Sequence, residues 1–232
     1  MGPPMNRVAD EKKKFWGLLR PGRCLVPTWR GCLALILGLA ILGVACLRSI
    51  YPFLATNDPC PGGVMVAEGW ASDHTLEYAV AEFRRNHYEK IYVTGGPVEI
   101  GTFISNYPTY AERGAAALVG MGLGTNEVQA VPAPITRQDR IYTAAAALRN
   151  WWHEHGVAPK SVNLISQGPH ARRTRLFYRK ALGKEVQVGV VALPGRDIDP
   201  KHWWRSSSGF RNVVDELVGY TYAILFFQTR GE

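Results

Sequence analysis

The fold of this chain is decided by the stretch GVMVAEGWASDHTLEYAVAEFRRNHYEKIYVTGG, which runs from residue 63 to residue 96. It begins with a short apolar run, Val64 to Ala67, and ends with a second one, Ile91 to Val93. Between the two runs, apolar residues recur at helical spacing: Leu76, Ala79, Val80 and Phe83. A strand, an amphipathic helix and a second strand in this order predict a β-α-β unit with parallel strands.

The same alternation continues along the chain. Three further apolar runs of strand length follow: Val128 to Val131, Val162 to Ile165, and Val186 to Leu193. Apolar residues at three- and four-residue spacing predict four more helices: Thr109 to Met121, Gln138 to His155, Ala171 to Leu182, and Arg211 to Phe227. Five strands alternating with helices predict one α/β domain over residues 62–232, with a doubly wound parallel sheet and its first strand at the centre.

A different segment precedes this domain. The run GCLALILGLAILGVACL, from Gly31 to Leu47, has 17 residues without a charge and lies between Arg30 and Arg48. This pattern predicts a transmembrane helix over residues 31–49, after a basic segment (1–30) and before a linker (50–61). Two alternatives stay open: a cleaved signal peptide, or a lipid attached at Cys46.

The charge distribution indicates a topology. Residues 1–48 contain 8 Lys/Arg and 2 Asp/Glu, whereas the remainder contains 19 and 17. By the positive-inside rule, the N-terminus is expected in the cytoplasm and the α/β domain on the extracytoplasmic, periplasmic side of the inner membrane, after a single pass. Since the excess of basic residues lies beside the membrane and not on the domain, nucleic acid is not an expected partner.

The densest group of polar and charged side chains follows the fourth predicted strand, in the segment from Ser166 to Arg175. Arginines in a first helical turn oppose the helix dipole, and a bound anion there would reverse this penalty. Because the carboxyl ends of parallel strands hold the ligands in such sheets, Ser166, Arg172 and Arg173 are candidate ligand-binding residues and His170 is a candidate catalytic residue. The alternative is that His170 caps the helix and the arginines pair with neighbouring carboxylates.

Two other loops at the same sheet edge contain further candidates for ligand binding: Thr94, Gly95, Gly96, Arg137, Asp139 and Arg140. The glycines would let backbone amides approach a phosphate or carboxylate, while the charged residues could equally form a surface salt-bridge cluster.

Two glutamates are candidate acid/base groups. Glu68 ends the first strand, where burial would raise its pKa; orienting a ligand is its alternative role. Glu112 lies early in a helix, where favouring the helix dipole is the alternative. The histidines and cysteines have no metal or disulfide spacing, so no metal site is expected, and no cofactor is indicated.

Two aromatic segments near the C-terminus have several interpretations. His202-Trp203-Trp204-Arg205 could stack on a sugar or base, lie at the membrane interface, or cover the core. The last predicted helix is too short in apolar length for a second span, so it is expected to dock on the core or on the membrane surface.

Four blocks occur in the order found in the YdcF/SanA/ElyC family: Thr94-Gly95-Gly96, Tyr110-Ala111-Glu112, Asp139-Arg140-x-Tyr142-Thr143, and Ser166-x-x-x-His170-x-x-Arg173. The chain resembles this family over roughly residues 62–227. It departs from the family in having Asp-Arg-Ile-Tyr-Thr where Asn-Thr is usual, and in one extra residue before His170. The resemblance implies a Rossmann-like, three-layer domain with a doubly wound parallel sheet, and several relatives are inner-membrane proteins associated with envelope or peptidoglycan integrity.

The sequence therefore leads to three functional hypotheses. The first is a membrane-anchored, envelope-facing domain that binds an anionic phosphate- or glycan-bearing molecule, either small or lipid-linked, in envelope biogenesis, with catalytic transformation of that molecule left open. The second is a noncatalytic membrane scaffold for envelope assembly. The third, implied by one cytoplasmic relative in the family, is a domain that binds S-adenosylmethionine.

Overall fold

The computed structural model describes residues 19–20, 26–99, 106–193, 195 and 198–228. The chain divides into two compact units, Met1–Ser49 and Ile50–Glu232. The second unit contains the whole α/β domain.

The first unit consists of a small strand pair and most of a long helix. Strands β1 (Leu19–Arg20) and β2 (Val26–Pro27) pair in antiparallel fashion. Helix α1 (Trp29–Leu54) has 26 residues, and it is the one helix among the described residues that is long and apolar enough to cross a membrane. At 1.5 Å per residue its length is about 39 Å, more than the ~30 Å of a bilayer core.

Helix α1 extends beyond the span predicted from the sequence. It continues to Leu54, so the first five residues assigned to the linker, 50–54, are helical. The helix continues because Tyr51 and Leu54 are buried against the α/β domain, where packing stabilises another turn.

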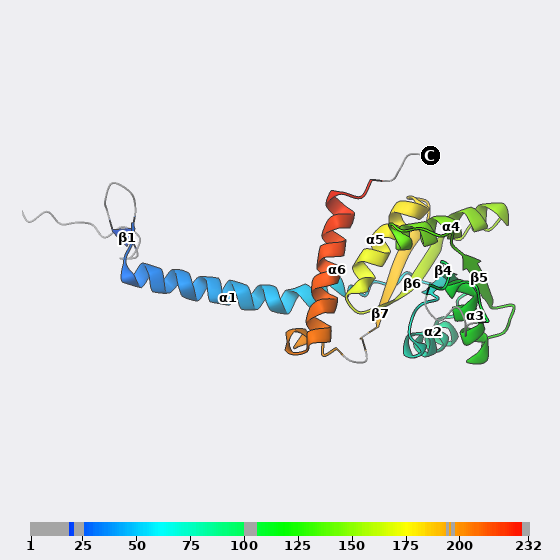
Figure 1. The fold of residues 1–232 in the computed structure, drawn as a ribbon, viewed down its shortest axis with the longest axis horizontal. Helices are drawn as coiled ribbons and strands as arrows, with labels where there is room; N and C mark the ends of the chain where they lie inside the picture. The colour runs from blue at the N-terminus through cyan, green and yellow to red at the C-terminus, as the bar shows by residue number, and fades with distance from the viewer. Residues whose placement is uncertain (1–18, 21–25, 100–105, 194, 196–197, 229–232) are drawn as a thin grey trace, which may run out of the picture. The chain divides into compact units, whose positions relative to one another are not determined.

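The second unit is built on a five-stranded parallel sheet, which confirms the predicted fold class (Figure 1). The strand order is β5-β4-β3-β6-β7. Its strands are β3 (Val64–Glu68), β4 (Ile91–Gly95), β5 (Val128–Pro132), β6 (Ser161–Gln167) and β7 (Gln187–Leu193). The first strand of the domain is therefore central, as predicted, and the chain reverses its direction of travel across the sheet between β3 and β6.

Helices connect the strands and continue after β7. They are α2 (Asp73–Asn86), α3 (Tyr110–Gly120), α4 (Arg140–Glu154), α5 (His170–Leu182), the 3₁₀ turn η1 (Trp203–Arg205) and α6 (Ser207–Leu225). Helix α6 begins four residues before the predicted start at Arg211, because the Ser206 hydroxyl accepts a hydrogen bond from the Gly209 amide and caps it.

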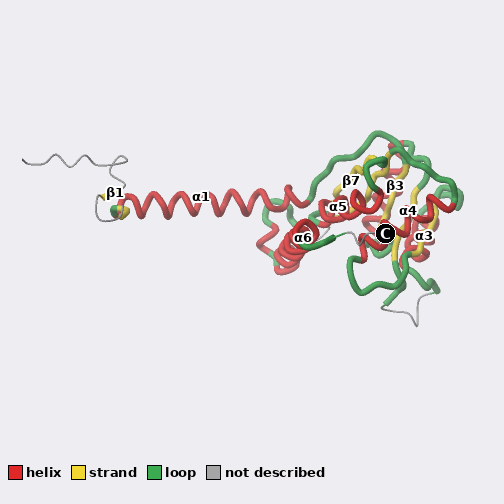
Figure 2. The backbone as a smooth tube through the Cα atoms, turned by 90° about the horizontal axis from the view of Figure 1, so that it is seen from above, coloured by secondary structure: helices red, strands yellow, loops and turns green. Residues whose placement is uncertain are grey.

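Alternation along the strands divides the core into two layers. In β3, Val64 and Val66 belong to a cluster with α4, α5 and α6, whereas Met65 and Ala67 belong to a cluster with α2 and α3. The helices thus cover both faces of the sheet, and Figure 2 shows the strands between them. A third cluster joins Tyr51 and Leu54 to Trp203 and Val213, so Trp203, the first residue of η1, covers the core.

Candidate functional site

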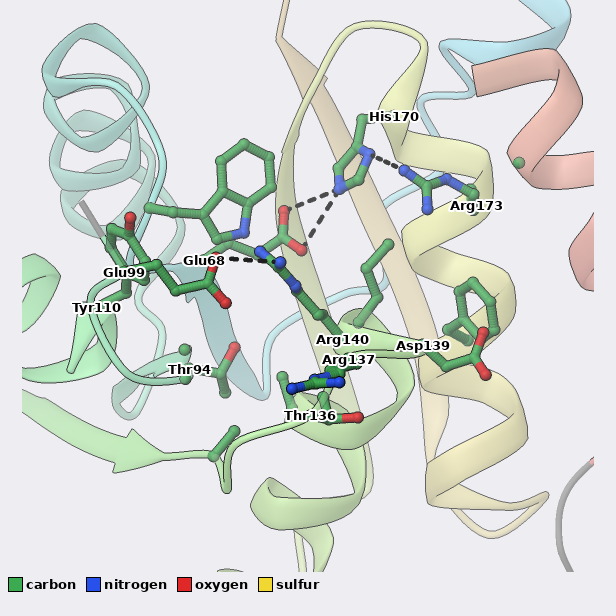
Figure 3. Close-up of a pocket in the computed structure, with 18 of the residues that line it drawn as sticks. Glu68, Thr94, Glu99, Tyr110, Thr136, Arg137, Asp139, Arg140, His170 and Arg173 are labelled. Atoms are coloured by element: carbon green, nitrogen blue, oxygen red, sulfur yellow. Dashed lines mark hydrogen bonds and ion pairs between the residues drawn. The ribbon is translucent and has the colours of Figure 1, made fainter. Parts of the chain in front are cut away.

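The candidate site lies at the carboxyl ends of β3 and β6, where the strand order reverses. Residues from these strand ends and from the helices beside them line a cavity of about 920 Å³. In this region β3 ends at Glu68, and β6 passes through Gly168, in a left-handed conformation (φ 48°), into His170 at the start of α5. The local chain geometry therefore brings a carboxylate and an imidazole to the same crevice (Figure 3).

Four charged side chains form what we term the buried charge network: Glu68, His170, Arg173 and Glu216. His170 Nε2 lies 3.2 Å from Glu68 Oε2, and His170 Nδ1 lies 2.8 Å from Glu216 Oε1. Arg173 donates two hydrogen bonds to Glu216, at 2.7 Å from Nε to Oε2 and 2.9 Å from Nη2 to Oε1. Two carboxylates thus alternate with two cations, and the network can be electrically neutral.

Protonation of His170 follows from this arrangement. Burial alone would disfavour the charged imidazole, but the carboxylates of Glu68 and Glu216 outweigh burial and raise the pKa of His170 to about 9. Burial also opposes the charged form of Glu216, yet hydrogen bonds from His170 and Arg173 lower its pKa to about 2. The imidazole is therefore a cation at neutral pH, with both ring N–H groups directed at carboxylates.

The network also explains the unusual start of α5. A cationic His170 in the first helical position opposes the helix dipole, as does Arg173 in the same turn. The anion that such a helix start favours is supplied by the protein itself, through Glu68 and Glu216. The alternative in which the arginines pair with neighbouring carboxylates thus describes Arg173 correctly.

A second group, which we term the rim cluster, lines the outer part of the cavity: Glu99, Arg137, Asp139 and Arg140. Arg140 Nη2 lies 3.1 Å from Glu99 Oε2, and both side chains are more than half exposed. Arg137 is exposed, and among the described residues it has no ion-pair partner. Its guanidinium is therefore available to an anion that enters the cavity.

Asp139 has a strained backbone at this rim. Its φ of 52° places it in the left-handed region, where it precedes the first residue of α4. Asp and Asn adopt this conformation more readily than most residues, although it still has an energetic cost. Asp139 lines the cavity, and its side chain makes no capping hydrogen bond to α4.

The Thr94-Gly95-Gly96 loop forms part of the cavity wall. Thr94 lies beside Glu68 in the β3–β4 register, and its hydroxyl is 2.9 Å from the buried hydroxyl of Tyr178. Burial, together with the charge of Glu68, raises the pKa of that tyrosine. A Cβ at Gly95 would lie 2.8 Å from Tyr110 Cβ, so close packing of α3 requires this glycine. At Gly96 the same Cβ would meet nothing nearer than 3.8 Å.

Three of the residues proposed from the sequence lie outside the cavity lining: Glu112, Ser166 and Arg172. Glu112 completes a capping box at the start of α3, where its carboxylate accepts hydrogen bonds from the Thr109 amide at 3.1 Å and hydroxyl at 2.7 Å. Ser166 is buried within β6. Arg172 donates to the Phe53 carbonyl and stacks on the Phe53 ring, so it holds the end of α1 against α5.

The other nine candidates line the cavity together: Glu68, Thr94, Gly95, Gly96, Arg137, Asp139, Arg140, His170 and Arg173. Sequence reasoning missed Glu216, which reaches the site from α6, far away in the chain. It also missed Trp70, whose ring is edge-on to His170 with centroids 5.3 Å apart. The available signal for Glu216 was its position as the last carboxylate before the apolar stretch Leu217 to Phe227, where a charge must find a partner.

Within the described ranges, no group of three or more His, Cys, Asp or Glu side chains is arranged to hold a metal ion. The cavity lining brings together the carboxylate of Glu68 and the exposed guanidinium groups of Arg137 and Arg140. No protein-family model matches the chain, and no curated protein shows significant sequence similarity to it.

Proposed function

We propose that this protein is a membrane-anchored, envelope-facing enzyme that binds and transforms an anionic molecule bearing a phosphate or a glycan, either soluble or linked to a lipid. The observation that carries the proposal is the contact between Glu68 and His170 at the reversal point of the sheet, beside a cavity large enough for such a ligand. Cavities at this position are the usual ligand sites of doubly wound sheets.

Glu68 is the proposed acid/base group. Its carboxylate ends the central strand, lines the cavity, and is held by the Nε2–H of His170. The other N–H of His170 is directed at Glu216, so both ring protons are engaged within the protein. Glu68 would accept a proton from a water or hydroxyl bound in the cavity, while His170 holds the carboxylate in place.

The rim cluster is the proposed site for the anionic group. The cations of the buried charge network are already neutralised by Glu68 and Glu216, whereas Arg137 is exposed and Arg140 forms an exposed ion pair with Glu99. An anion in the cavity would therefore be bound by these two guanidinium groups, with Gly96 providing room for close approach of the backbone.

Anchoring of the protein is proposed through α1, with the N-terminus in the cytoplasm and the α/β domain on the periplasmic side. The length and apolar composition of α1 support a single pass, and the basic residues that precede it support this orientation. The resemblance to the YdcF/SanA/ElyC family motivates the assignment to envelope or peptidoglycan biogenesis.

The test is thermal unfolding of the full chain in detergent, with and without candidate ligands. The panel contains inorganic phosphate, polyprenyl phosphates, nucleotide sugars, peptidoglycan fragments and S-adenosylmethionine. A ligand at about 100 times its Kd should stabilise the protein by about 2.7 kcal/mol. We expect the shift to disappear in Arg137→Ala and to persist in Arg85→Ala, a matched exposed arginine on α2.

One observation favours a second candidate, the noncatalytic scaffold. Arg173 is fully engaged with Glu216, which is the arrangement expected if the crevice has only a structural role. If none of the anionic classes alters the unfolding temperature, the scaffold becomes the better description. A shift with S-adenosylmethionine alone would instead support an adenosyl-cofactor domain.

A further inference from the structure

The second half of α6 exposes apolar side chains where a soluble domain would have polar ones. Five residues define what we term the α6 apolar face: Val218, Tyr222, Ile224, Leu225 and Phe226. Between 45% and 68% of each is exposed. The first half of the same helix exposes Arg211, Asn212 and Asp215 and one large apolar residue, Phe210, so the exposed apolar residues are concentrated after Glu216.

This clustering is local to one end of the domain. Ten large hydrophobic residues of the described part of Ile50–Glu232 are exposed, and five of them form the α6 apolar face. The exposed positions of α2 on the other side of the sheet include Glu77, Arg84 and Arg85. Five exposed large apolar residues gathered at one end of a single helix indicate an interaction surface.

The helix that carries the α6 apolar face also packs against the last turn of α1. Phe53, in the last turn of α1, packs edge-on against Tyr220 of α6 with ring centroids 5.6 Å apart, and is itself 44% exposed. Tyr51 and Leu54 of the same turn are buried with Val213 of α6. Where the chain leaves α1, it is therefore packed directly on the helix that exposes the patch.

Two cations from α5 lie over aromatic rings of residues that adjoin the α6 apolar face without belonging to it. The Arg172 guanidinium lies 4.0 Å from the centre of the Phe53 ring and 5.9 Å from that of Tyr220. The Lys180 ammonium lies 5.0 Å from the centre of the Phe227 ring and donates to the Phe227 carbonyl at 3.3 Å. Aromatic and aliphatic residues bordered by Arg and Lys are typical of helices that lie in the headgroup region of a membrane.

From these observations we infer that the α6 apolar face lies on the bilayer into which α1 inserts, with its side chains among the upper acyl chains and Arg172 and Lys180 at the level of the lipid phosphates. The inference rests on the anchoring proposed above and adds a second membrane contact. A lipid surface fits better than a second copy of the chain, because the helix that carries the patch packs against the last turn of α1, and two cations of α5 lie over aromatic rings beside it.

Membrane contact by α6 has a consequence for the cavity. Val218 and Tyr222 belong both to the α6 apolar face and to the cavity lining. The opening beside α6 would therefore face the lipid headgroups, and a ligand with an anionic head and an apolar chain could enter without leaving the bilayer surface.

The experiment uses spin labels on the full chain, in a background with the four cysteines replaced by alanine, reconstituted in vesicles of phosphatidylethanolamine and phosphatidylglycerol. Three positions are compared: Leu225→Cys on the patch, Leu39→Cys within α1, and Thr125→Cys in the exposed turn between α3 and β5. Phe226→Cys serves as a second reporter on the patch. Circular dichroism confirms that each labelled variant is folded.

We expect labels at Leu225, Phe226 and Leu39 to collide more with oxygen than with a water-soluble nickel complex, and the label at Thr125 to show the reverse. A patch label that behaves like Thr125 while Leu39 lies in lipid overturns the inference and leaves the anchor intact. Exposure of the Leu39 label to water would overturn the anchoring itself. Patch labels shielded from both reagents would indicate burial against protein, and would replace the membrane with a second copy of the chain.

Discussion

The buried charge network and the rim cluster use the same residue types in one cavity, but they differ in solvation. In the network, His170 and Glu216 have side chains only 9% and 11% exposed. In the rim cluster, the paired side chains of Arg140 and Glu99 are 67% and 52% exposed. Charges removed from water must be matched within the protein, whereas charges at the rim can exchange partners with solvent or ligand.

Because of this difference in solvation, we expect the buried charge network to stabilise the fold and the rim cluster to bind the ligand. The network holds β3, α5 and α6 in register at the base of the cavity, and it fixes the ionisation of Glu216 and His170. The rim cluster is expected to contribute little to stability, since its one ion pair among the described residues is exposed, and Arg137 is the cation proposed to bind the anion. This division of roles would be wrong if substitution of a rim residue lowered the free energy of unfolding strongly, or if substitution of a network residue left it unchanged.

The largest effect is expected for Glu216→Ala. This change leaves Arg173 and His170 without their shared carboxylate in a buried site, and removal of one partner from a buried ion pair costs about 3–5 kcal/mol. Chemical denaturation of the full chain in detergent would measure the loss in the free energy of unfolding. Glu216→Gln should lose less, because its amide oxygen can still accept one of the hydrogen bonds.

Glu99→Ala is the matched control for that variant. It removes the carboxylate of an exposed ion pair with Arg140, and such pairs contribute about 0–1 kcal/mol. Equal losses of stability in Glu99→Ala and Glu216→Ala would mean that burial does not distinguish the two groups.

A dependence of stability on alkaline pH is the next largest effect. The pKa of His170 is raised by its carboxylate partners from 6.5 to about 9, so its contribution to stability is fully present below the lower value and is lost as pH rises through the upper one. A shift of this size corresponds to a loss of about 3 kcal/mol. The free energy of unfolding should therefore fall over this window.

His170→Asn provides the comparison, since it cannot titrate. Its free energy of unfolding, measured by urea denaturation at the same pH values, should lack the part of the slope that comes from the imidazole. At acid pH the dependence runs the other way, because the pKa of Glu216 is lowered. Its contribution to the free energy of unfolding is fully present above pH 4.5 and is lost as the pH falls through about 2. Parallel alkaline slopes in His170→Asn and the unaltered protein would contradict the assignment to His170.

Much of the fold could be predicted from the sequence because periodicity and burial agree in it. The short apolar run from Val64 to Ala67, bounded by glycines, favoured a strand buried on both faces, and the first strand of a doubly wound sheet is typically central. Helix ends were predicted less well, because they depend on single side chains. Ser206 caps α6 earlier than its apolar pattern begins, and packing of Leu54 extends α1 past its apolar run.

The site was only partly predictable, for a physical reason. Residues at strand ends, such as Glu68 and His170, are brought together by the topology of the sheet, which the sequence pattern reveals. Glu216 comes from a helix after the last strand, and nothing in its local sequence shows which face of α6 meets α5. Glu112 illustrates the opposite error, because a carboxylate near a helix start has the same sequence pattern whether it caps or catalyses.

Glu112→Ala tests that distinction with a smaller expected effect. Loss of the capping box at Thr109 should reduce the free energy of unfolding by about 1 kcal/mol. Thr109→Ala should cause a similar loss, since it removes the other half of the box. Any ligand found by thermal unfolding should shift Glu112→Ala as much as the unaltered protein. A selective loss of ligand binding in Glu112→Ala, with stability unchanged, would restore this residue to the site.

The smallest effect on stability, and the sharpest test of the comparison, is expected for Arg137→Ala. This side chain is exposed at the rim and lacks an ion-pair partner among the described residues, so its removal should change the free energy of unfolding by less than about 0.5 kcal/mol. Arg173→Ala, by contrast, removes a guanidinium that donates two hydrogen bonds to buried Glu216, and should destabilise the protein strongly. Isothermal titration of both variants with the anion that stabilises the unaltered protein separates binding from stability. If the rim binds the anion, Arg137→Ala weakens binding while the free energy of unfolding is unchanged. If binding survives in Arg137→Ala, the anion is bound by other residues, and Arg137 is not part of the anion site.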